Sequence, residues 1–352
     1  MNCKLLLTIF FITSVPAIFA QSGRVKPAET PKPEVPRPSV VYTPTQTVIS
    51  NPSPTAKETP KIQEDDIIKV ESALVPIPVS VLNAGQVVDN LKIEDFVLQI
   101  DGQTAEIGEF ARSETPVRLA LLFDNSSSAT IAREFEIKAA VRFFKRVLRP
   151  SKDLAALFSV STGTRLEQPL TKDVSQLTTA IETFPTPQGA TALLDGIIKA
   201  ADYLRDADGR RVIVIVSDGE DTISDATFEE TMKAVQANNC QVYVVKTKDF
   251  ENYKQTGRRG GNANIRALAA ERRMQDITAQ TGGAVYSPID ERELDQAFGQ
   301  ISAELAQQYV LSYYPENDSD KRGEFRTISL SVKSRPNLTI RTRKGYYVPR
   351  QR

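Results

Sequence analysis

The 352 residues are more than one small domain needs and can bury at least one sizeable core. Lysine plus arginine and aspartate plus glutamate both number 44, so no net charge favours nucleic acid or an anionic membrane as a partner. The chain has no histidine, which excludes Ser-His-Asp and Cys-His catalysis, histidine-bound zinc and histidine pH switches.

Residues 1–20 are typical of a secretory signal peptide. Lys4 precedes the apolar run from Leu5 to Ile12, and we expect cleavage after Ala20. An uncleaved membrane anchor is the alternative, but the run is shorter than the roughly 20 residues that a span needs. No other stretch of the sequence has the pattern of a transmembrane segment, so we expect an exported mature chain that is periplasmic, on the cell surface or secreted.

Two segments of different character follow the signal peptide. Prolines recur among Thr, Ser, Lys and Glu in residues 21–62, which is typical of a disordered, partly extended linker. In residues 63–115, Asn-Ala-Gly and Asp-Gly turns separate short apolar stretches, a pattern that predicts strands joined by hairpins. Pro76 and Pro78 place one of these strands at a sheet edge or a bend.

Residues 116–308 alternate between strand and helix patterns. "VRLALLFD" and "RVIVIVSDG" are continuous apolar runs typical of buried strands, and "TRLEQPLT" is expected to be a hairpin partner of "DLAALFSVST". "ATFEETMKAVQANN" and "NIRALAAERRMQDITAQT" have helical periodicity, and Gly282 is expected to close the second of these helices. The alternation predicts an α/β domain with a doubly wound, mostly parallel sheet, covered by helices on both faces.

Residues 309–352 return to strand patterns. Neither this segment nor residues 63–115 is large enough to hold a stable core alone, but together they approach the size of an immunoglobulin-like domain. We therefore predict one small β-sandwich, built from both segments, into which the α/β domain of residues 116–308 is inserted. Removal of the signal peptide leaves Cys240 as the single cysteine, and its apolar strand predicts a buried, unreactive thiol.

Two of the predicted buried strands end in carboxylates, at Asp124 and at Asp218. In open α/β sheets, ligands bind beyond the carboxyl ends of the strands, at the point where the strand order reverses. If these two strands are neighbours there, their loops meet, and Thr191 at the start of a helix brings a hydroxyl to the same place.

The residues at these ends form an oxygen-only donor set. Hard divalent cations prefer such donors, so the sequence predicts a Mg²⁺ site, with Mn²⁺ or Ca²⁺ as alternatives. The predicted ligands are Asp124, Ser126, Ser128, Thr191 and Asp218. Each motif alone also has a simpler interpretation, because Asp, Ser and Thr are common helix caps and Asp-Gly is a common turn.

"FDNSSS", "GATALLDG" and "VSDGED" together resemble the von Willebrand factor A (VWA) domain, a Rossmann-like fold with a metal-ion-dependent adhesion site (MIDAS). The resemblance covers about 190 residues and implies that Asp124, Ser126 and Ser128 supply the first loop, Thr191 the second and Asp218 the third. The flanking segments further resemble exported VWFA-related proteins of acidobacteria. Ala190 departs from the family, which often has two glycines in this loop.

Three functions are open at this point. The resemblance favours a non-enzymatic adhesion or protein-binding module that captures an Asp or Glu carboxylate of a protein partner through the ion. A metal-assisted hydrolase or phosphatase is the second, although the sequence has no phosphate-binding glycine loop and no obvious general base except Glu220 or Asp221. The third is a structural envelope protein whose ion only stiffens loops.

Overall fold

The computed structural model describes residues 74–112, 115–127, 133–149, 151–258, 264–315, 323–333 and 337–348. The predicted signal peptide and linker therefore lie outside the described residues, as does Ser128. None of the described helices is both long and apolar enough to span a membrane.

A six-stranded sheet forms the centre of the α/β part, in the order β11-β10-β9-β6-β7-β8. Its strands are β6 (Val117–Asp124), β7 (Leu154–Val160), β8 (Thr164–Thr171), β9 (Arg210–Ser217), β10 (Cys240–Lys246) and β11 (Val285–Tyr286). All neighbours are parallel except β7 and β8, which form the predicted hairpin. The prediction of a mostly parallel sheet is confirmed.

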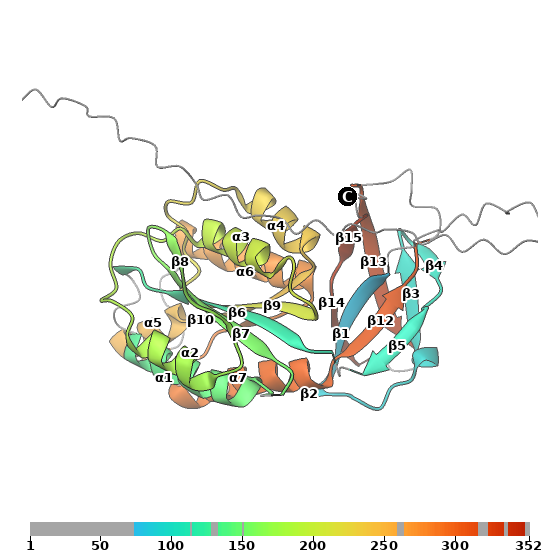
Figure 1. Ribbon diagram of the computed structural model, residues 1–352, viewed down its shortest axis with the longest axis horizontal. Coiled ribbons are helices and arrows are strands. Elements are labelled where there is room, and N and C mark those ends of the chain that lie inside the picture. Colours follow the sequence, from blue (N-terminus) through green and yellow to red (C-terminus); the bar gives the residue numbers. More distant parts are fainter. Residues whose placement is uncertain are drawn as a thin grey trace, which may run out of the picture. The chain divides into compact units, whose positions relative to one another are not determined.

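Helices cover both faces of this sheet (Figure 1). They are α1 (Arg133–Val147), α2 (Val174–Glu182), α3 (Leu193–Leu204), α4 (Phe228–Ala237), α5 (Lys248–Thr256), α6 (Ile265–Thr281) and α7 (Glu291–Gln307). One face packs on α1, α2 and α7, and the other on α3, α4 and α6. Gly282 ends α6 with a φ of 83°, a left-handed conformation that glycine adopts without strain, as the sequence predicts.

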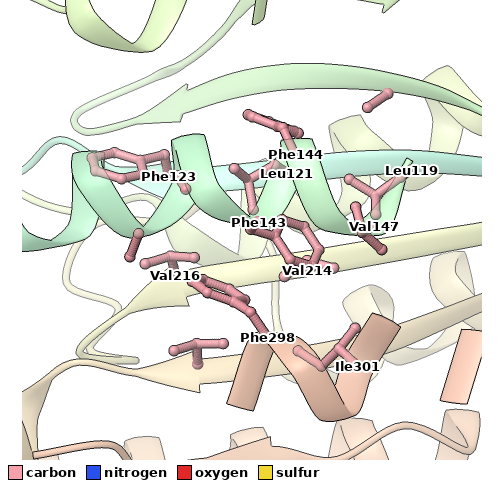
Figure 2. Close-up of a cluster of buried hydrophobic side chains, with 14 of the residues drawn as sticks. Leu119, Leu121, Phe123, Phe143, Phe144, Val147, Val214, Val216, Phe298 and Ile301 are labelled. Carbon is pink, nitrogen blue, oxygen red and sulfur yellow. The ribbon is translucent and has the colours of Figure 1, made fainter. Parts of the chain in front are cut away.

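The core on the first face is aromatic at its centre (Figure 2). Phe143 of α1 and Phe298 of α7 lie with ring centroids 4.6 Å apart, over the apolar side chains of β6 and β9. Large rings bury more apolar area than aliphatic side chains, so this contact contributes strongly to the packing of both helices. It fixes α7 against the sheet.

Strands from both ends of the chain form two further sheets, in the orders β14-β1-β12-β5 and β15-β13-β3-β4, and β2 pairs with β1. Their bounds are β1 (Val75–Asn83), β2 (Gln86–Val87), β3 (Phe96–Ile100), β4 (Gln103–Ala105), β5 (Glu109–Arg112), β12 (Tyr309–Tyr313), β13 (Phe325–Val332), β14 (Thr339–Thr342) and β15 (Gly345–Tyr347), with a 3-10 turn at Ile93–Asp95. Apolar side chains of both sheets belong to one buried cluster, among them Ile77, Leu311, Leu98 and Ile328.

The two prolines of β1 occupy an edge. Residues Val75 to Val79 pair with β12, whereas pairing with β14 begins only at Val79. Pro76 and Pro78 therefore have a neighbouring strand on one side only, although β1 as a whole lies between β12 and β14 inside its sheet. The predicted edge position thus holds for the first residues of β1 and not for the whole strand.

The α/β part begins and ends at the same place, near Arg210, the first residue of β9. The Arg210 backbone N–H donates to the carbonyl of Pro116 at 2.8 Å, just before β6. Its Nη1 donates to Oε1 of Gln308 at 2.8 Å, just after α7. Asp218 follows the other end of β9, so the chain enters and leaves the α/β part at the edge opposite the predicted metal site.

Candidate metal site

The strands that carry the two predicted carboxylate ligands are neighbours. β6 and β9 pair in parallel, with Phe123 opposite Val216, so their carboxyl ends lie side by side. The chain continues from β6 to β7 and β8 on one side, and from β9 to β10 and β11 on the other. The strand order thus reverses between β6 and β9, where ligands of open α/β sheets bind.

Backbone hydrogen bonds join the three predicted loops. The N–H of Ser127, in the loop after β6, donates to the carbonyl of Gly189 at 3.1 Å. The N–H of Thr222, in the loop after β9, donates to the carbonyl of Thr191 at 2.9 Å. Because backbone bonds hold the loops, their side chains are fixed relative to one another. Four of the five predicted ligands are brought to this edge: Asp124, Ser126, Thr191 and Asp218.

Asp124 is the most constrained of these side chains. It is 2% exposed, accepts a hydrogen bond from Ser217 Oγ at 2.6 Å and accepts another from the Ser126 N–H at 2.9 Å. Burial nevertheless raises the pKa of Asp124, and the negative charge of Asp218 adds to the shift. These hydrogen bonds do not replace the lost hydration of this carboxylate.

These residues fit a hard divalent cation. Within the described part of the chain, neither Asp124 nor Asp218 forms an ion pair with a lysine or arginine, although both are buried. No three carboxylate or thiol groups among the described residues lie close enough to hold an ion by themselves. An ion here would need the hydroxyl oxygens of Ser126 and Thr191 as well, which is the donor set that magnesium and manganese accept.

Two buried glutamates lie near these aspartates, and the sequence analysis did not identify them. Glu136 of α1 is 1% exposed and Glu251 of α5 is 4% exposed. Burial raises the pKa of Glu136 well above its usual range, and the nearby charges of Asp124 and Glu251 add to the shift. Burial also raises the pKa of Glu251 to about 7, against the attraction of Lys248 at 3.6 Å.

The sequence does contain signals for some of these groups. Glu136 directly follows Phe135 in the apolar stripe of its helix, so its position on the buried side could have been predicted. Ser217 directly follows the apolar run of residues 212–216 in its strand and directly precedes Asp218. Glu251 had no comparable signal, because α5 is mostly polar.

Asp221, one of the two residues considered as a general base, has another role. Its Oδ1 accepts hydrogen bonds from the backbone N–H groups of Leu193 at 2.8 Å and Leu194 at 3.2 Å. These are the first residues of α3, so the carboxylate satisfies free N–H groups at a helix N-terminus. This use of Asp221 weakens the case for a hydrolase.

Residues 119–220, which include the loops after β6 and β9, match the von Willebrand factor type A domain family. This protein contains a VWA domain. No curated protein matches the chain. The narrower resemblance to exported acidobacterial proteins stays a prediction.

The solved structures that match this chain have little sequence in common with it. An aerotolerance-related membrane protein from Bacteroides fragilis is 20% identical over 54% of this chain and 98% of its own, with a TM-score of 0.41. The PilB minor pilin from Streptococcus sanguinis is 13% identical over 58% of this chain and 64% of its own, with a TM-score of 0.42. A von Willebrand factor type A protein from Catenulispora acidiphila is 11% identical over 80% and 76%, with a TM-score of 0.42.

The match spans less than two thirds of the pilin, and all three TM-scores are below 0.5. The family assignment therefore rests on the sequence match of residues 119–220.

Proposed function

We propose that this protein is an exported, non-enzymatic binding protein whose VWA domain captures an acidic residue of a partner protein through a bound Mg²⁺. Asp124, Ser126, Ser128, Thr191 and Asp218 would hold the ion. When bound, the ion would supply an electron-poor centre that accepts a carboxylate oxygen from outside. The proposed location follows from the signal-like residues 1–20.

The observation that carries this proposal is the convergence of two buried carboxylates that lack a basic partner. Asp124 and Asp218 stand at the ends of adjacent strands, and backbone bonds tie the loop of Thr191 to them. Burying negative charge without a counter-charge is unfavourable, and a divalent cation removes that cost. With hydroxyl oxygens as its remaining protein ligands, the ion would stay electron-poor and keep an open coordination position, which favours a carboxylate oxygen from a partner.

Measuring Mn²⁺ binding by water-proton relaxation and by calorimetry tests the proposal. We expect one site in the wild type, no binding in Asp124→Ala, and weakened binding in Ser126→Ala and Thr191→Ala, because water can replace a neutral ligand. Asp208→Ala, an exposed aspartate at the other end of the sheet, is the control and should bind as the wild type does.

Added acetate should lower the water relaxation of the Mn²⁺ complex, because a carboxylate would displace water from the ion. Equal Mn²⁺ affinities of wild type and Asp124→Ala would refute the metal site. Unchanged relaxation with acetate would refute carboxylate capture while leaving the metal site in place.

We further propose that the two outer sheets form one β-sandwich into which the VWA domain is inserted. Support comes from the pairing of β1 with β12 and β14, and of β3 with β13, since each pair joins a strand before the VWA domain to one after it. The shared apolar cluster of both sheets supports it as well.

A further inference from the structure

A cavity of about 390 Å³ lies at the opposite end of the VWA sheet from the metal site. The first residues of β9 and β10, Arg210 and Cys240, line it on one side, and strands β1, β5 and β12 line it on the other. Its volume is within the range of sites for small organic ligands. Nothing in the proposed metal-dependent function uses it.

One wall of the cavity is apolar and rigid. Pro76, Pro78, Val310 and Ala111 line it. Pro78 pairs with Val310, and Val310 with Ala111, so these side chains lie side by side on one face of their sheet. Side chains alternate along a strand, and the intervening Ile77 and Leu311 enter the core on the other face.

Three arginines also line the cavity, and their hydrogen-bond partners among the described residues are all neutral. Arg210 donates from Nη2 to the carbonyl of Leu305 at 2.7 Å, in addition to its bond with the Gln308 side chain. Arg211 donates to backbone carbonyls, and Arg343 donates to the side-chain oxygen of Asn239. None of the three arginines forms an ion pair within the described residues.

The positive charge of this lining is buried and largely uncompensated. Arg210 is 7% exposed and Arg343 is 8% exposed, and the Nε of each has no hydrogen-bond partner in the described part of the chain. Burial lowers the pKa of each guanidinium to about 10. Among the described residues of the lining, Glu109 is the single acidic one, and its carboxylate accepts a hydrogen bond from the Tyr314 hydroxyl at 3.0 Å.

We propose that this cavity binds a small amphipathic carboxylate, with its head group at Arg210 and Arg343 and its aliphatic body against Pro76, Pro78 and Val310. A planar guanidinium pairs well with a carboxylate, and an anion would compensate the buried charge. The apolar wall would bury the aliphatic body of the ligand. A singly charged head group matches a lining in which one acid already offsets part of the positive charge.

Calorimetry with decanoate, in the presence of EDTA, tests the proposal on the full chain. The chelator removes any ion from the metal site, so carboxylate binding there does not contribute. Decanoate should bind at one site, while decanamide, which lacks the charge, and acetate, which lacks the chain, should each bind at least 10-fold more weakly, as expected for loss of a charge-assisted hydrogen bond or of apolar burial.

Arg343→Gln should weaken decanoate binding roughly 10-fold or more, because it removes a charged donor. Arg272→Gln is the matched control, since the Arg272 side chain is 86% exposed on α6. Two further variants keep all three arginines. Ala111→Trp should fill the cavity from the edge strand β5 and abolish binding, whereas Glu109→Gln should tighten binding by removing the opposing charge.

Decanoate and decanamide of equal affinity would overturn the proposed role of the arginines. Unchanged decanoate binding in Ala111→Trp would overturn the proposed location of the ligand in this cavity. This test remains available if Arg343→Gln fails to fold. Absence of decanoate binding to the wild type would overturn the proposal as a whole and leave the metal-dependent function untouched.

Discussion

At the scale of single residues, the carboxyl groups of Asp124, Asp218, Glu136 and Glu251 are all buried near the proposed metal site. Among the described residues, these four carboxylates form one ion pair, between Glu251 and Lys248 at 3.6 Å. Like charges in a poorly hydrated environment favour either proton uptake or a bound cation. The folded protein without metal is therefore expected to hold protons that the unfolded chain releases.

This arrangement predicts a pH dependence of stability in the presence of chelator. Glu251 has a pKa of about 7 in the folded state and an ordinary value of 4.5 when unfolded, so the folded state binds more protons between these values. Its contribution to the free energy of unfolding is present below pH 4.5 and is lost as the pH rises through 7. Glu251→Gln should remove that part of the slope in urea denaturation between pH 5 and pH 7.5.

Glu229→Gln, at an exposed position on α4, is the control for this measurement and should keep the slope of the wild type. Glu136→Gln should act in the same direction as Glu251→Gln, because burial raises the pKa of Glu136 too. If the wild type and Glu251→Gln lose stability equally with rising pH, Glu251 is not protonated in the folded state.

At the scale of elements, the turn between α6 and β11 leaves no room for side chains. A Cβ added to Gly283 would lie 1.7 Å from the carbonyl oxygen of Val242, in the neighbouring strand β10. Gly283→Ala is therefore expected to destabilise the protein by roughly 3 kcal/mol, because the backbone must move. Gly163→Ala is the control, since no atom lies within 4 Å of its added Cβ and its φ is not positive.

Urea denaturation of both variants checks this expectation. Midpoints of Gly283→Ala and Gly163→Ala that agree with each other would contradict the close approach of α6, β11 and β10.

Elements with a strong local pattern could be predicted from the sequence. β6 and β9 are continuous apolar runs, and α6 ends at a glycine that supplies its left-handed end. Helix α5 was missed because "KDFENYKQT" contains few apolar residues. The helix is held by a contact between residues distant in sequence, because Phe250 stacks on Phe135 with ring centroids 3.8 Å apart. Local hydrophobic periodicity does not predict such a contact.

The residues of the candidate site also fall into those that the sequence predicts and those that it does not. Asp124 and Asp218 could be predicted because each ends a recognisable strand, and the position of ligand sites at such ends is general. The bond of Ser217 to Asp124 depends on the pairing of β9 with β6, which the sequence alone does not give. The approach of Glu136 and Glu251 to these aspartates depends on how α1 and α5 pack on the sheet.

At the scale of the whole molecule, the outer sheets depend on strands from both ends of the chain. Removing residues 309–352 would take away both long partners of β1, which are β12 and β14, and the partner of β3, which is β13. Limited proteolysis should then cut within residues 74–112, while Mn²⁺ binding by the VWA domain persists.

Ile328→Asp tests the same dependence without a deletion. Ile328 is 3% exposed in the shared core of β3 and β13, so a charge there would destabilise this core. The substitution should raise protease sensitivity in residues 74–112 without removing any strand. Resistance of these residues in both variants would contradict the proposed β-sandwich.

The adjacent entry and exit of the α/β part have a mechanical consequence. A tensile force applied at the loops of Asp124 and Asp218 leaves the α/β part along two covalent routes, through Pro116 and through Gln308. The strands beyond these points, β5 and β12, are antiparallel neighbours, with Arg112 opposite Tyr309. Both routes thus load adjacent strands of one sheet, so tension is shared between two segments of backbone.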